Sequence, residues 1–240
     1  WEKQLDGKQA AQINLDAVKG TNDANQLRNA EQLMTDGADK PFLSVYFSDV
    51  NRGWIVGAYG LAFATEDGGK HWQSIISQVE NPKLRHLYGI QAVNGKIYFT
   101  GEQGTLLSSS DGHKFSAVKT PYAGTYFGLV GGAKNELVVY GLRGNVYRSE
   151  DGGSHWDKVD LGLPVTVTTG LRLNNGNLLL ADETGRVLQS RDGGRSFKPV
   201  VVPKPSYFSS LAATADGGLA LSCARGMARL DASSLNIESK

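Results

Sequence analysis

Several features that mark common protein classes are scarce or missing in this sequence of 240 residues. It has a single cysteine, Cys223, which excludes an internal disulfide framework. No run of 18 apolar residues occurs, so we expect no segment that crosses a membrane. The 25 basic and 24 acidic residues nearly balance, and no basic run is longer than a pair. The chain therefore lacks the basic patch that nucleic-acid binding requires, and we expect no nucleic-acid partner.

What the sequence does contain is a short phrase that recurs. It reads TEDGGKHW at Thr65–Trp72, SEDGGSHW at Ser149–Trp156 and SRDGGRSF at Ser190–Phe197, and a copy one residue short lies at Ser109–Phe115. Asp and Gly-Gly favour a tight turn, because Gly adopts positive φ and Asp accepts hydrogen bonds from nearby backbone amides. We expect the aromatic residue to begin a strand and to pack over the turn. The residues assigned to these structural turns are Asp67, Trp72, Asp111, Phe115, Asp151, Trp156, Asp192 and Phe197.

The spacing of the phrases predicts the fold. Consecutive aspartates lie 44, 40 and 41 residues apart, which suits one four-stranded propeller blade per repeat. A glycine five residues before each phrase keeps the same period, and one further glycine continues it beyond the last phrase. The sequence therefore predicts an all-β propeller with five repeats, forming one domain over residues 1–240. The glycines that mark the repeats are Gly60, Gly104, Gly144, Gly185 and Gly226.

The N-terminal region breaks this period. Residues 8–36 are rich in Ala, Gln, Asn, Leu and Glu, and their apolar residues follow helical spacing. They predict a helical hairpin inserted between blades, with the first helix ending at Gly20 and the second capped by Thr21 or Asn22. The insert is either a surface excursion or an arm that docks a partner.

The first five residues predict one more strand. Trp1–Leu5 resembles the end of a phrase with the outer strand that follows it, and the fifth repeat has no outer strand of its own. We therefore expect Trp1–Leu5 to complete the fifth blade and close the ring. The alternative is a longer parent with two more blades upstream, which would make seven. Because the chain begins with Trp rather than Met, we expect a processed or trimmed product that has lost any targeting signal.

The phrase resembles the Asp-box, or BNR repeat, of sialidases and many secreted β-propellers. The segment Asp49–Gly60, which reads DVNRGWIVGAYG, resembles the photosystem II stability/assembly factor family and its bacterial relatives, and the resemblance covers roughly residues 41–231. It implies a propeller on the lumenal or periplasmic side of a membrane, so we expect an exported protein, periplasmic or extracellular. Members from plants and cyanobacteria assist the assembly of a membrane complex, and some other bacterial relatives are tied to membrane exporters.

The topology of a blade separates two ends of the sheets. The Asp-boxes join the third and outer strands, whereas the turns between second and third strands lie at the opposite end, with the connections between blades. Propeller binding sites usually occupy that second end. Arginines and tyrosines gathered there suit a protein or an anionic ligand, and the alternative is a set of solvated loop residues. The expected binding patch comprises Tyr59, Arg85, Tyr88, Gln103, Tyr122, Tyr126, Arg143, Glu183, Tyr207 and Arg225, with His86 beside them.

Three functions are compatible with this pattern. The first is a non-enzymatic scaffold that binds and helps assemble or regulate a membrane-protein complex. The second is a sialidase-like glycoside hydrolase, but the arginine motif and the Tyr/Glu pairing that it needs do not stand out, and the acids near the patch are mainly Glu102 and Glu183. The third is passive carbohydrate binding by the aromatic loop residues. We predict a scaffold with no catalytic residues, no cofactor and no metal, because His86 and His113 lack zinc-ligand spacing and each Asp-box aspartate is expected to bond its own turn.

Overall fold

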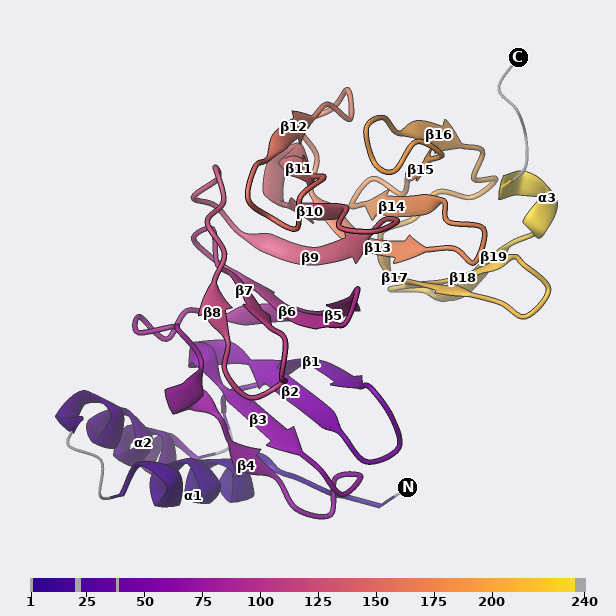
Figure 1. Cartoon of the computed structure of the whole chain (residues 1–240). Helices are drawn as coiled ribbons and strands as arrows, with labels where there is room; N and C mark the ends of the chain where they lie inside the picture. The colour runs from indigo at the N-terminus through magenta and orange to yellow at the C-terminus, as the bar shows by residue number, and fades with distance from the viewer. Residues whose placement is uncertain (1, 20–22, 38, 236–240) are drawn as a thin grey trace. The chain divides into compact units, whose positions relative to one another are not determined.

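The computed structural model describes residues 2–19, 23–37 and 39–235, which fall into two compact units, Trp1–Ala117 and Val118–Lys240. Both units consist of antiparallel sheets of the propeller-blade type, two in the first unit and three in the second (Figure 1). The prediction of an all-β propeller with five repeats is confirmed.

The first unit holds blades 1 and 2, each a four-stranded meander in which neighbouring strands pair in chain order. Blade 1 comprises β1 (Phe42–Phe47), β2 (Gly53–Gly57), β3 (Ala62–Thr65) and β4 (Gln73–Ser74). Blade 2 comprises β5 (Leu87–Val93), β6 (Lys96–Gly101), β7 (Leu106–Ser109) and β8 (Ser116–Ala117). Short 3-10 turns occur at η1 (Ala58–Gly60) and η2 (Ile76–Gln78).

The second unit holds blades 3, 4 and 5. Blade 3 comprises β9 (Tyr126–Gly131), β10 (Leu137–Gly141), β11 (Val146–Ser149) and β12 (Asp157–Val159), with η3 (Leu142–Gly144) between its middle strands. Blade 4 comprises β13 (Val167–Arg172), β14 (Leu178–Asp182), β15 (Val187–Ser190) and β16 (Lys198–Val200). Blade 5 has only β17 (Phe208–Ala213), β18 (Leu219–Cys223) and β19 (Gly226–Leu230), followed by α3 (Ala232–Leu235).

Neighbouring blades within each unit share an apolar core. Between blades 1 and 2, this core contains Phe99 and Phe115, whose rings stack with centroids 3.9 Å apart. Tyr140 and Leu180 belong to the core between blades 3 and 4, and Phe208 belongs to the one between blades 4 and 5. The second strands β2, β10 and β14 are buried along their whole length, and their side chains are apolar on both faces apart from Asp182 at the end of β14.

The second strand of each of the first three blades ends at a glycine that touches the chain entering the same blade. A Cβ at Gly57, Gly101 or Gly141 would lie within 2.4 Å of the carbonyl oxygen of Pro41, His86 or Thr125, respectively. The next residue donates its backbone N–H to that same carbonyl in all three blades. These contacts bring the turn between second and third strands against the connection into the blade, as the sequence predicts.

The predicted helical hairpin is present as α1 (Gly7–Val18) and α2 (Ala24–Asp36). A capping box between Asp6 and Gln9 starts α1. The second helix is capped by Asp23, whose carboxylate accepts the N–H groups of the first turn, so the prediction of Thr21 or Asn22 as the cap is wrong. Gly20, Thr21 and Asn22 themselves lie outside the described residues. No helix in the described part of the chain is long and apolar enough to cross a membrane.

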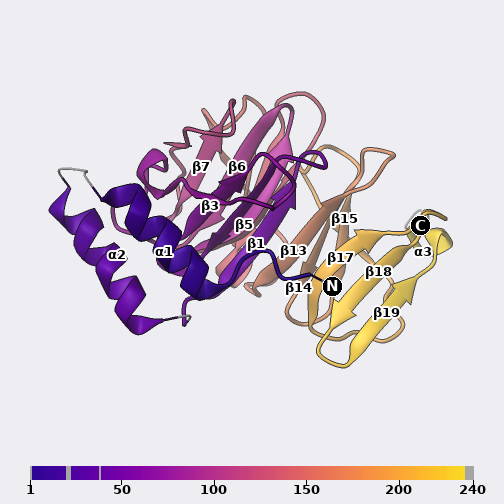
Figure 2. The same ribbon diagram turned by 90° about the horizontal axis from the view of Figure 1, so that it is seen from below.

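The hairpin packs on the face of blade 1 that points away from blade 2 (Figures 1 and 2). Side chains alternate along β2, so Trp54 faces the core shared with blade 2 and Ile55 faces the helices. Ala10 and Leu33 of the helices are buried against this face, together with Phe63 of β3. The helices thus cover part of this sheet face.

The prediction of an outer strand at Trp1–Leu5 is wrong. Residues 2–5 form no strand, and Trp1 lies outside the described residues. The Gln4 side chain instead donates from Nε2 to the carbonyl oxygen of Gly68, 3.2 Å away in the first Asp-box, and Asp6 then begins α1. The segment serves as a lead-in to the helix, and blade 5 keeps three strands.

The first glycine of an Asp-box accepts a hydrogen bond from outside its own blade in two further places. The indole N–H of Trp54 in blade 1 donates to the Gly112 carbonyl oxygen in blade 2, at 2.8 Å. Arg148 in blade 3 donates from Nε to the Gly193 carbonyl oxygen in blade 4, at 2.6 Å. These bonds tie the Asp-box of one blade to its neighbour, a role that the repeat pattern alone does not show.

Candidate functional site

The Asp-box aspartates are committed to their own turns. The Thr65 hydroxyl donates to Oδ1 of Asp67 at 2.9 Å and accepts the Gly69 N–H, also at 2.9 Å. The backbone N–H of His71 donates to Oδ1 of Asp67 at 2.9 Å, and its ring Nδ1 lies 2.6 Å from the other carboxylate oxygen. Equivalent bonds hold Asp151 and Asp192. In the shortened copy, Asp111 accepts two backbone N–H groups in the same manner.

The aromatic residues of the boxes differ in burial. Phe115 and Trp72 are 1% and 7% exposed, respectively, whereas Trp156 and Phe197 are only half-buried. Trp156 packs back over its turn, as expected, and its indole N–H donates to the carbonyl oxygens of Gly153 and Lys119. The Asp-boxes are therefore structural turns, and the opposite ends of the blades are left as the candidate binding surface.

We expect acid to weaken these turns. Hydrogen bonds from the backbone and ring of His71 lower the pKa of Asp67 to about 2, and those from His113 and Ser109 do the same for Asp111. Since an unfolded aspartate titrates near pH 3.9, the unfolded state binds more protons between about pH 4 and pH 2. Stability that is present above pH 4 should therefore be lost across this window, as thermal unfolding at several pH values would show. Asp67→Asn should show a shallower loss than the wild type, and identical slopes would contradict the prediction.

At the opposite end, three turns share an unusual backbone. Tyr59, Gln103 and Arg143 have φ values of 54°, 53° and 56°, and a glycine with positive φ follows each. The N–H after the glycine closes each turn by donating to the residue before the left-handed position. This type I′ geometry suits the twist of a hairpin. It leaves the side chains of Tyr59, Gln103 and Arg143 exposed to solvent.

In the first unit, aromatic rings gather beside the turn of blade 1. The Tyr59 ring lies 4.9 Å from the His86 ring, which lies 6.3 Å from the Tyr88 ring. Lys40, which precedes the first strand, places its Nζ 4.9 Å from the Tyr59 ring centroid. Arg85, the residue before His86, donates from its guanidinium to the Gln103 carbonyl oxygen at 3.2 Å. We call Lys40, Tyr59, Arg85, His86 and Tyr88 the aromatic–cationic cluster.

The second unit holds the remaining predicted patch residues. Tyr122 packs edge-on against Tyr126, with ring centroids 5.6 Å apart. Tyr126 is wholly buried, so it supports the surface from beneath and does not belong to it. Tyr207 is 52% exposed and Arg225 is exposed.

Arg143 and Arg225 are not backbone equivalents, although both precede a repeat glycine. Arg143 has positive φ, whereas Arg225 does not. In blade 5, Cys223 pairs directly with Gly226, which leaves a two-residue loop, Ala224-Arg225. The side chains therefore leave their turns from different positions.

The comparisons with known proteins agree with this architecture. The family model for "Photosynthesis system II assembly factor YCF48" matches residues 24–227. The chain belongs to the YCF48 family. The Ycf48 lipoprotein of Synechococcus sp. (strain CC9902), named as a photosystem II assembly protein, is 25% identical over 159 residues. That alignment covers 64% of this chain and 47% of the relative, so the chain spans about half of the relative's length.

Two solved YCF48 structures show the same fold. One, described as YCF48 bound to D1 peptide, has a TM-score of 0.64 at 20% identity and covers 80% of this chain and 63% of that one. The other, YCF48 from Cyanidioschyzon merolae, has a TM-score of 0.60 at 16% identity and covers 80% of this chain and 67% of that one.

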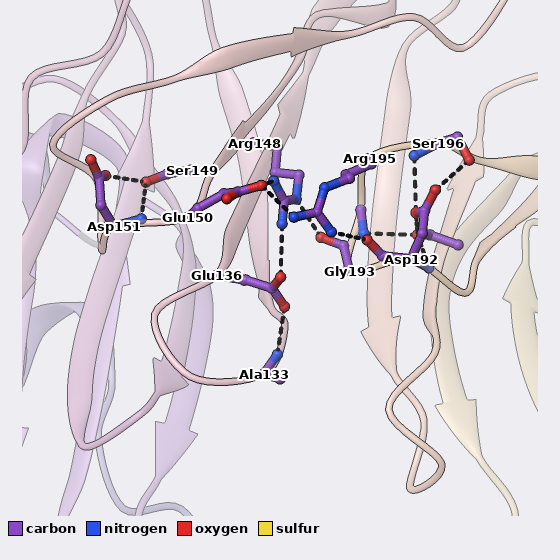
Figure 3. Close-up of polar contacts among 12 residues, drawn as sticks. Ala133, Glu136, Arg148, Ser149, Glu150, Asp151, Asp192, Gly193, Arg195 and Ser196 are labelled. Atoms are coloured by element: carbon purple, nitrogen blue, oxygen red, sulfur yellow. Dashed lines mark hydrogen bonds and ion pairs between the residues drawn. The ribbon is translucent and has the colours of Figure 1, made fainter.

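Two sets of residues in this YCF48 family member were missed by the sequence argument. Lys40 lies 19 residues before Tyr59 in the numbering and only the folded chain brings it over the ring. Arg148 forms the second set, with Glu136, Glu150 and Arg195, across two neighbouring blades (Figure 3). The available signal for that network was an arginine in β11, two residues before an Asp-box glutamate.

Proposed function

We propose that this chain is a non-catalytic assembly factor that binds a segment of a membrane protein at the turn ends of its blades. The observation that carries the proposal is the aromatic–cationic cluster in the first unit. Tyrosine and arginine are the residues most enriched where protein partners bind tightly. Membership of the YCF48 family and a relative described as bound to D1 peptide support a membrane protein as the partner.

The acids at this end support binding over hydrolysis. Glu102 accepts the His86 backbone N–H at 3.2 Å, and Glu183 accepts the Thr166 N–H at 2.8 Å. Both carboxylates therefore hold the entry to a blade, and neither is placed as the acid or nucleophile that a glycoside hydrolase needs. Arg85 in the first unit and Arg143 in the second each add positive charge, which favours a partner segment with acidic or carboxylate groups.

The same reasoning extends to location. A partner embedded in a membrane must be met at that membrane's surface, and the curated relative is named a lipoprotein. We accordingly place the function outside the cytoplasm, in the periplasm or beyond, with assembly of a membrane complex such as photosystem II or an exporter as the process served.

The test is capture of partners from detergent-solubilised membranes of the source cell, read by mass spectrometry. The wild type should capture a specific integral membrane protein. Tyr59→Ser, and separately the double variant Arg143→Glu/Arg225→Glu, should each reduce capture at least about tenfold, equivalent to about 1.4 kcal/mol.

The control carries the same charge change elsewhere. Lys158→Glu/Lys198→Glu alters two exposed residues on the outer strands β12 and β16 and should capture normally. Undiminished capture by both site variants would refute the proposed surface. Turnover of a fluorogenic sialoside by the wild type would refute the non-catalytic assignment.

A further inference from the structure

A cleft lies between the helical hairpin and blade 1, where the two do not pack closely. Its volume is about 300 Å³, at the lower end of the range for ligand sites. Val18 and Leu33 line it from the helices, and Leu61, Ile76 and Leu84 line it from blade 1 and the connection that follows it. All of these residues belong to the first unit. The helices and the blade side of the cleft therefore both contribute apolar side chains to its lining.

The polar part of the lining is dominated by carboxamides. Asn14, Gln26, Asn29 and Gln32 all border the cleft. Asn14 is engaged by the Ser74 hydroxyl, which donates to its Oδ1 at 2.9 Å. The Gln32 amide donates to Asp36 at 2.5 Å. Two of the four carboxamides thus have fixed partners within the fold.

Gln26 differs from these two. Its Oε1 atom is shielded from solvent and has no hydrogen-bond partner among residues 2–19, 23–37 and 39–235. A polar atom that is shielded from water and has no hydrogen-bond partner costs free energy. A group that supplies the missing hydrogen bond inside the cleft would recover part of that cost.

The charged groups of the cleft neutralise one another. Lys40 lies 3.1 Å from Asp36 and 2.6 Å from Asp39, and its side chain is only 13% exposed. Asp36 also accepts the Gln32 amide, so neither charge is left to attract an ion. A charged ligand would lose hydration here and gain no counter-charge, which favours an uncharged one.

We propose that this cleft binds a short, apolar and uncharged peptide segment. A peptide group both donates and accepts hydrogen bonds, so it complements a row of carboxamides, while apolar side chains fill the floor. Tyr59 borders the cleft and also belongs to the aromatic–cationic cluster, so one extended segment can occupy both. The inference deepens the proposed function and rests on it to the extent that both sites take the same partner.

The direct test uses the full chain and a blocked tripeptide, N-acetyl-Leu-Ala-Leu-amide, titrated in nuclear magnetic resonance experiments. The side-chain amide signal of Gln26 should shift saturably, with a dissociation constant of about 1 mM. Asn29→Trp places an indole in the cleft from an exposed helix position and should weaken binding at least about tenfold. Arg28→Trp, the neighbouring exposed position that does not line the cleft, should bind as the wild type does.

Three results would overturn the proposal. They are absence of a saturable Gln26 shift, equal binding by Asn29→Trp and Arg28→Trp, and equal or tighter binding of N-acetyl-Asp-Ala-Asp-amide or octyl glucoside. Because this titration needs no membrane partner, it tests peptide binding in the cleft even where the capture experiment finds no partner. Where capture succeeds, its loss in Asn29→Trp but not in Arg28→Trp would place the cleft in the same interface.

Discussion

Replacing Arg148 with methionine should lower the free energy of unfolding by about 1 to 3 kcal/mol, the usual cost of leaving a hydrogen-bonded polar group without its partner. The Arg148 side chain is 4% exposed and its guanidinium makes three contacts (Figure 3). It donates to Glu136 at 2.7 Å and to the Gly193 carbonyl oxygen at 2.6 Å, and it also pairs with Glu150. Methionine would fill a similar space but would remove the hydrogen bonds that Arg148 donates to Glu136 Oε1 and to the Gly193 carbonyl oxygen.

The matched control for this variant is Arg195→Ala. Arg195 also pairs with Glu150, at 2.7 Å, but its side chain is 58% exposed and the pair is solvated. Exposed pairs contribute at most about 1 kcal/mol, so this variant should unfold close to the wild type. Urea unfolding followed by circular dichroism measures both. If both variants lost the same free energy of unfolding, Arg148 would contribute no more to stability than an exposed ion pair does, and the prediction would be wrong.

Phe115→Ala should also lower the free energy of unfolding by about 3 to 5 kcal/mol, the range for truncating a buried aromatic residue. Phe115 is 1% exposed and stacks on the wholly buried Phe99 in the core between blades 1 and 2. Its backbone also exchanges hydrogen bonds with Gln78 and Glu80. Truncation would open a cavity in this core. The backbone bonds to Gln78 and Glu80 hold the chain in place, so the surrounding structure could not move in to fill the cavity.

The comparison is with Trp156→Ala in the third Asp-box. Trp156 holds the same place in its phrase but is half-buried, and it contributes mainly its indole hydrogen bonds. Its loss should cost about 1 to 2 kcal/mol. We thus expect the stability of the protein to depend more on Phe115, in the shortened Asp-box copy, than on Trp156. A larger loss at Trp156 than at Phe115 would contradict this order.

Most of the fold could be predicted because the repeat marks both ends of a blade. Each Asp-box fixes the turn before an outer strand, and glycines such as Gly144 fix the turn between the middle strands, so few registers remain. The two helices followed from apolar spacing alone. The outer strand at Trp1–Leu5 failed because a local pattern cannot show whether a strand has a sheet to join, and Gln4 and Asp6 found other partners.

The candidate site was harder to predict. Tyr59 and Arg143 were found because their position relative to the repeat glycine fixes their exposure. Burial of Tyr126 was missed because it depends on how Tyr122 folds over it. Lys40 was missed because its contact with Tyr59 depends on how the hairpin returns to blade 1. Contacts of this kind depend on the path of the chain, which no periodic signal encodes.

The left-handed turns at Tyr59, Gln103 and Arg143 have a consequence for how such a protein can diverge. In each turn the closing hydrogen bond joins two backbone groups and a glycine follows the left-handed residue, so the side chain of that residue takes no part in closing the loop. A tyrosine, a glutamine and an arginine already occupy the same backbone conformation in successive blades. A substitution at one of these exposed positions can therefore change which partner is recognised without changing the fold of the blade. The Asp-box ends have no such freedom, since there the side chains themselves make the turn.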